Sequence, residues 1–162
     1  MSGKPKFVIF AHNATYDKLH QVATLGLTAA AMGKDVIVVL LFWTIKKLAE
    51  GKIDEIDFPP EYAASAEQVA RLLKEKKVPK ISEMFQEARL VGHFRLIACS
   101  AGLEYMGVEA GAVERNVDEV LGLPAHLPDA AVGLAPVLDR LLDLAGEDRP
   151  HLVGEVVARL GV

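Results

Sequence analysis

The sequence predicts an α/β protein built around a parallel sheet, and three observations lead to this class. Two apolar, β-branched runs, 6–11 and 35–42, flank a segment whose apolar residues recur at spacings of three and four. The second run is apolar without alternation, which is typical of a strand covered on both faces. A third short strand is expected at 94–98. The first strand, the long helix and the second strand form a βαβ unit, whose crossover is right-handed in nearly all proteins.

Between the second and third strands, the sequence predicts three further helices. The first is short and covers 43–50. The second is capped by Ser65, and Gln68 three residues later completes a capping-box pattern. The third follows Pro79, is capped by Ser82 and carries its apolar residues through Val91. All three belong to the long connection between the second and third strands.

The segment after the third strand contains four expected elements. In order, these are a short helix, a helical turn, an edge strand and the clearest amphipathic helix of the chain: 100–106, 117–121, 129–132 and 134–145. A further apolar set lies at 151–160, and it is able to cover the sheet or to dock on another subunit. We assign 1–146 to one α/β domain and 147–162 to a C-terminal helical extension of the same domain.

The composition and charge of the chain argue against a nucleic-acid-binding protein and a membrane-spanning protein. The 162 residues suit a single domain with a substantial core, since 51% of them are hydrophobic. The formal net charge of −4 argues against a nucleic-acid surface, which depends on clustered Lys and Arg. The longest apolar run, 36–43, is far shorter than the ~20 residues of a spanning helix, so no membrane span is expected. No signal-peptide pattern follows the basic start, and we expect a cytoplasmic protein.

Chemistry-bearing side chains gather where the predicted strands end. His12 and Asn13 follow the first strand, Trp43 follows the second, and Cys99 and Ser100 follow the third. Ligands of parallel α/β sheets bind at this carboxyl edge, so these five residues form the candidate site. The single cysteine excludes an intrachain disulfide and a Cys-x-x-Cys pair. No metal and no cofactor is expected, because the zinc-ligand set is incomplete and the glycines lack a dinucleotide fingerprint.

Cys99 is the candidate nucleophile. It stands at the expected start of a short helix, where unpaired N–H groups favour a thiolate. Glu104, one turn further on, would oppose that charge if it pointed inward. His12 could orient or deprotonate the thiol, or serve only in the turn. Trp43 suits a wedge in the core or at an interface, and a cysteine buried for packing alone remains the alternative for Cys99.

Two segments resemble the DsrE/DsrF-like family. One is Leu96-Ile-Ala-Cys-Ser-Ala-Gly-Leu-Glu-Tyr-Met-Gly-Val108, and the other is the opening βαβ unit with Ala29-Ala-Ala-Met-Gly33 before Asp35-Val-Ile-Val-Val39. The resemblance implies a three-layer α/β/α sandwich, assembly as a trimer or hexamer, and a persulfide carried on Cys99. The sequence departs from the family at Phe42-Trp-Thr, where many relatives have Gly, and in the tail after Gly146.

Three functions follow from these observations. The first is a sulfur carrier or sulfurtransferase-like protein, in which Cys99 receives sulfur from a donor protein and passes it to an acceptor protein. The second is a thiol redox protein, in which Cys99 forms a sulfenic acid that an external thiol resolves. The third is a non-catalytic oligomeric assembly or ligand-binding module whose cysteine only packs. The sequence alone leaves all three open.

Overall fold

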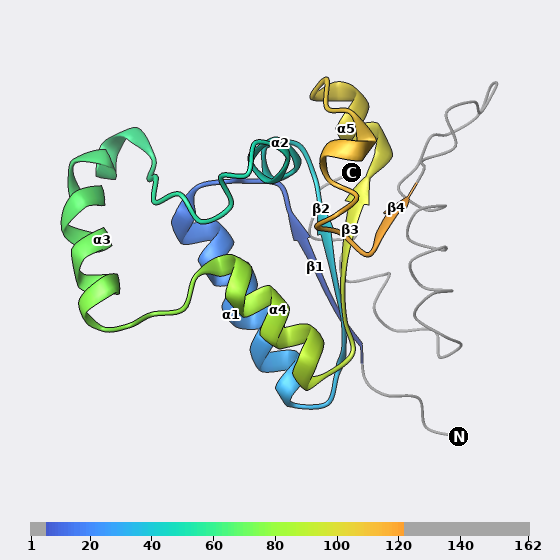
Figure 1. Ribbon diagram of the computed structural model, residues 1–162, viewed down its shortest axis with the longest axis horizontal. Helices are drawn as coiled ribbons and strands as arrows, with labels where there is room; N and C mark the ends of the chain where they lie inside the picture. Colours follow the sequence, from blue (N-terminus) through green and yellow to red (C-terminus); the bar gives the residue numbers. More distant parts are fainter. Residues whose placement is uncertain (1–5, 122–162) are drawn as a thin grey trace, which may run out of the picture. The chain divides into compact units, whose positions relative to one another are not determined.

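The computed structural model describes residues 6–121, and they form an α/β unit around a four-stranded parallel sheet (Figure 1). The strands stand in the order β1-β2-β3-β4, and every neighbouring pair is parallel: Lys6–Ala11, Asp35–Leu40, Phe94–Cys99 and Glu119–Leu121. The predicted α/β class with a parallel sheet is confirmed. The expected strand 129–132, the helix 134–145, the tail 151–160 and the extension 147–162 lie outside the described residues.

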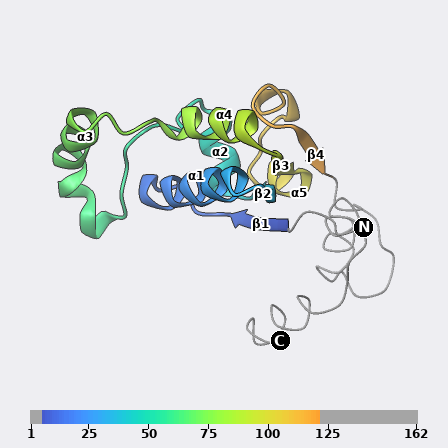
Figure 2. The ribbon, with the colours of Figure 1, turned by 90° about the horizontal axis from the view of Figure 1, so that it is seen from below.

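Helices connect these strands and cover the sheet. The described α-helices are α1 (Tyr16–Ala31), α2 (Trp43–Ala49), α3 (Ala66–Glu75), α4 (Ile81–Val91) and α5 (Ser100–Tyr105), with 3₁₀ helices η1 (Pro60–Ser65) and η2 (Ala110–Ala112). α1 and α4 pack side by side over the sheet, as the two ribbon views show (Figure 2). α2 and α5 lie at the carboxyl edge of the strands. None of these helices combines the length and the apolar character needed to cross a membrane.

The hydrophobic core lies between the sheet and the α1–α4 pair. Alternate residues of β2 and β3 point into it together with apolar side chains of both helices: Val36, Val38, Leu40, Phe94, Leu96, Ala98, Leu19, Ala23, Ala30, Ile81, Met84, Phe85 and Ala88. The intervening residues Ile37, Val39 and Ile97 are also buried. Both faces of the central strands are therefore covered, as the unbroken apolar run of β2 predicts, and the fold is consistent with a three-layer α/β/α sandwich.

The segment predicted as a helical turn at 117–121 is a strand instead. Glu119–Leu121 forms β4, which pairs with β3 so that Leu121 stands opposite Cys99. Asp118 ties this segment to β3, because its backbone N–H donates to Leu96 O (2.8 Å) and its carboxylate accepts the Leu96 N–H (2.7 Å). Arg89 of α4 holds the same carboxylate at 3.1 Å. The prediction was wrong because, over only three residues, the spacing of apolar side chains does not distinguish a strand from a helix.

Two predicted helix caps also differ from the structure. α3 does begin after Ser65, but the Ser65 side chain makes no cap hydrogen bond, because Ser65 is the helical last residue of η1. α4 begins at Ile81, so Ser82 lies within its first turn. The Ser82 N–H and hydroxyl donate to the Asp54 carboxylate at 2.9 and 2.6 Å. A carboxylate distant in sequence thus binds Ser82, and the local cap of α4 is Glu83, whose carboxylate accepts the Lys80 N–H at 2.9 Å.

Candidate functional site

Cys99 lies at the carboxyl edge of the sheet, as its last β3 residue and as the N-cap of α5. Its backbone is extended (φ −76°, ψ 120°), and the residue is partly exposed. The chain turns into α5 at Ser100. Gly102 of α5 lies next to both strand ends: a Cβ at this position would be in ordinary contact with the Phe42 N (3.5 Å) and the Cys99 Cβ (3.6 Å), and only the Ile45 side-chain end, at 2.7 Å, would have to move. Cys99 is therefore a strand-end residue beside the turn that follows β2.

That turn presents aromatic side chains to solvent. The Thr44 N–H donates to Leu41 O at 3.2 Å, and Phe42 between them has φ 46° and ψ −118°. These angles define the first central position of a type II′ turn, which glycine ordinarily occupies. Phe42 stacks on Tyr105 of α5 with 6.3 Å between ring centroids, and both are exposed. Trp43 is 59% exposed. We call Phe42, Trp43 and Tyr105 the aromatic rim.

Trp43 is thus not a wedge in the core, and its exposed side chain is available for contact with another molecule. The strained backbone of Phe42 also indicates that the aromatic rim is available for contact with another molecule. An L residue in this conformation costs on the order of 1–3 kcal/mol, and such strain concentrates at functional positions. The chain thus keeps an exposed aromatic side chain in a backbone conformation that glycine ordinarily adopts.

Phe42→Gly is expected to change the free energy of unfolding by no more than about 1 kcal/mol, although the variant loses a whole aromatic side chain. Relief of the turn offsets the lost stacking on Tyr105. Urea denaturation checks this, with Tyr105→Ala as the control that loses the stacking without relieving the turn. A loss of 3 kcal/mol or more, the magnitude of a core aromatic truncation, would show that Phe42 is retained for packing.

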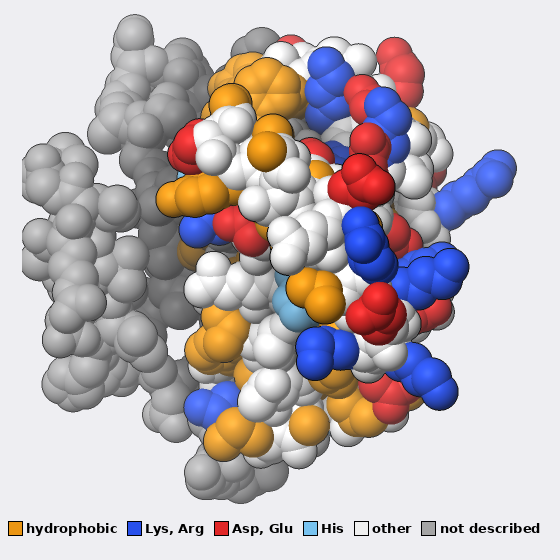
Figure 3. Space-filling model, turned by 90° about the vertical axis from the view of Figure 1, so that its left-hand side faces the viewer, with side chains coloured by type: hydrophobic (Ala, Val, Ile, Leu, Met, Phe, Trp, Pro, Cys, Tyr) orange, Lys and Arg blue, Asp and Glu red, His pale blue; other side chains and the backbone are white. Residues whose placement is uncertain are grey.

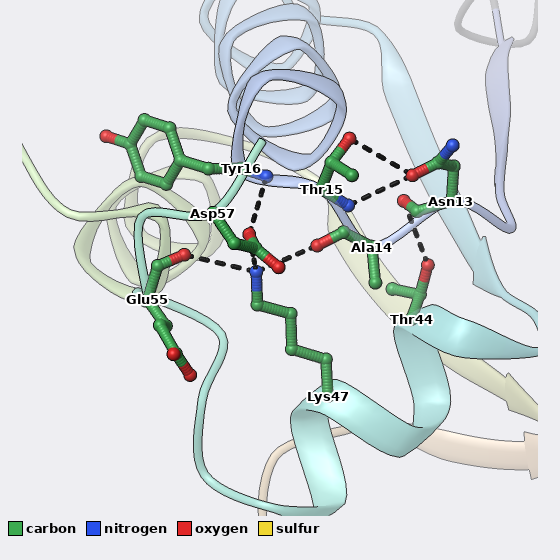
Figure 4. Close-up of polar contacts among 8 residues, drawn as sticks. All are labelled: Asn13, Ala14, Thr15, Tyr16, Thr44, Lys47, Glu55 and Asp57. Carbon is green, nitrogen blue, oxygen red and sulfur yellow. Dashed lines mark hydrogen bonds and ion pairs between the residues drawn. The ribbon is translucent and has the colours of Figure 1, made fainter. Parts of the chain in front are cut away.

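A buried lysine organises the carboxyl end of β1 (Figure 4). The side chain of Lys47 in α2 is only 8% exposed. Its ammonium donates to Ala14 O (2.8 Å), to Glu55 O (3.1 Å) and to the Asp57 carboxylate. Lys47 therefore joins α2 to the turn after β1 and to the loop before η1. The sequence did not indicate this role, since lysine is rarely buried; the nearby acidic loop was the one available signal.

Asn13 belongs to the same polar network. Its Oδ1 accepts hydrogen bonds from the Thr15 N–H (3.0 Å) and hydroxyl (3.1 Å), and its backbone oxygen accepts one from the Thr44 hydroxyl (3.4 Å). The Tyr16 N–H, the first of α1, donates to the backbone oxygen and Oδ1 of Asp57 at 2.9 and 3.0 Å. The side chain of Asn13 is thus engaged in starting α1.

The Tyr16 phenol lies beside this network and is not a general base at neutral pH. Burial, and secondly the negative charge of Asp54, raise the pKa of Tyr16 above its ordinary value of 10.0. The neutral phenol is therefore the form present near pH 7. Its ring contacts are aromatic, with Phe58 edge-on at 6.3 Å between centroids. The Tyr16 ring therefore contributes to packing.

The structure brings Cys99, Ser100 and the aromatic rim to one part of the edge and places His12 further away. His12 is exposed after β1, and β2 separates β1 from β3. Two strand spacings, roughly 10 Å, therefore lie between the backbones of His12 and Cys99. Glu104 is exposed on α5. Across residues 6–121, no group of three His, Cys, Asp or Glu side chains is arranged to hold a metal ion.

The fold and this edge define an α/β protein whose one cysteine ends the third strand of a parallel sheet. No protein-family model matches the chain, and no curated protein matches it. A function for this protein is therefore inferred from the arrangement of residues at the carboxyl edge of the sheet.

Proposed function

We propose that the protein is a persulfide carrier of the DsrE/DsrF-like kind, with sulfurtransferase-like chemistry at Cys99. The observation that carries this proposal is the position of Cys99: partly exposed, at the end of a central parallel strand and at the start of α5. A sulfur carrier needs a thiolate that a second protein can reach. The first N–H groups of a helix, which lack intrahelical partners, favour such an anion.

The transfer requires two displacement steps. In the first, the Cys99 thiolate attacks the terminal sulfur of a donor persulfide; the new S–S bond forms on Cys99, and the donor leaves as a thiolate. In the second, an acceptor thiolate attacks the terminal sulfur of the Cys99 persulfide, and Cys99 leaves as a thiolate. No electrons are gained or lost overall, so neither an oxidant nor a cofactor is needed.

The rest of the chain supports a carrier that works with partners. The sequence contains no second cysteine that could release the persulfide as an internal disulfide, so an external thiol must take the sulfur. The aromatic rim offers that partner exposed Phe, Trp and Tyr side chains, the types enriched in protein interfaces. Ser100 follows Cys99 as the first residue of α5 and belongs to the proposed partner surface, and we assign His12 and Asn13 to the outer margin of that surface. We further propose a cytoplasmic homo-oligomer, a trimer or hexamer.

The experiment measures the intact mass after incubation with polysulfide. The parent protein is expected to gain the mass of one sulfur atom and to lose it when a thiol acceptor is added. Cys99→Ser is expected to abolish the gain completely, whereas Ser65→Ala, an exposed control outside the candidate site, retains it. The native alkylation rate of Cys99 with iodoacetamide provides a second readout.

Two outcomes would contradict the proposal. A thiol that is alkylated only after denaturation would make Cys99 a packing residue. A native thiol that gains oxygen from peroxide but never transferable sulfur would support the thiol redox alternative instead.

A further inference from the structure

We draw no further inference here: the strongest candidate, the surface patch on the side of η1 and α3 that includes the exposed Tyr62 and Leu72 (Figure 3), carries nothing because the described part of the chain does not show what covers it.

Discussion

Replacing Lys47 with methionine is expected to lower the free energy of unfolding by about 2–3 kcal/mol. Methionine fills nearly the same space, so the loss reports the ammonium and its hydrogen bonds rather than a cavity. Ala14 O and Glu55 O lose their shared donor, and the turn after β1 loses its link to α2. Asp57 is 48% exposed, so water can replace the lysine at its carboxylate, which keeps the cost below that of a fully buried pair.

The neighbouring Lys46 provides the control for this prediction. It lies in the same helix but is exposed, so Lys46→Met is expected to change the free energy of unfolding by no more than about 0.5 kcal/mol. Urea denaturation followed by circular dichroism measures both variants, with the midpoint shifting and the slope unchanged. If Lys47→Met were as stable as Lys46→Met, the Lys47 contacts would contribute nothing net, and another interaction would have to hold the turn.

The sequence predicted the elements whose signals are local and repeated. The strands 6–11 and 94–98 and the long helix α1 appear close to where they were expected, because β-branched runs and a periodic apolar face are read without knowledge of distant contacts. β4 and the start of α4 were missed for the opposite reason. The Asp118 carboxylate accepts a hydrogen bond from Leu96, and the Asp54 carboxylate accepts one from Ser82. Each bond joins residues more than twenty positions apart, so no local sequence pattern reveals it.

The candidate site was predictable as a location but not in its details. Parallel topology alone brings the ends of β1, β2 and β3 to one edge, so Cys99 and Trp43 were expected there. The role of Asn13 in starting α1 depends on hydrogen bonds that only the folded turn provides. Phe42 could not be placed, because a phenylalanine in a glycine conformation contradicts the propensity on which the prediction depends. The available signal was that many DsrE/DsrF-like proteins, which the sequence resembles, have Gly shortly after the second strand.

The second large effect is expected at Gly92, which joins α4 to β3. A Cβ there would lie 2.6 Å from the Ala30 O and 3.0 Å from its carbonyl carbon, both backbone atoms of α1. Gly92→Ala is therefore expected to lower the free energy of unfolding by about 3 kcal/mol, the upper end for overpacking, since helix backbone yields less readily than a side chain. Thermal or urea denaturation measures the loss.

Two other glycines separate this steric effect from the general effect of adding a methyl group. Gly111 has open space around its Cβ position, so Gly111→Ala is expected to be neutral within about 0.5 kcal/mol. At Gly102 the nearest atom, 2.7 Å away, is the flexible end of Ile45, which can move, so an intermediate loss of about 1 kcal/mol is expected. The φ of Gly92 is −164°, an extended value that alanine adopts freely, so the clash with α1 is the one source of destabilisation. If Gly92→Ala proved as stable as Gly111→Ala, α1 and the start of β3 could not approach as closely as the fold requires.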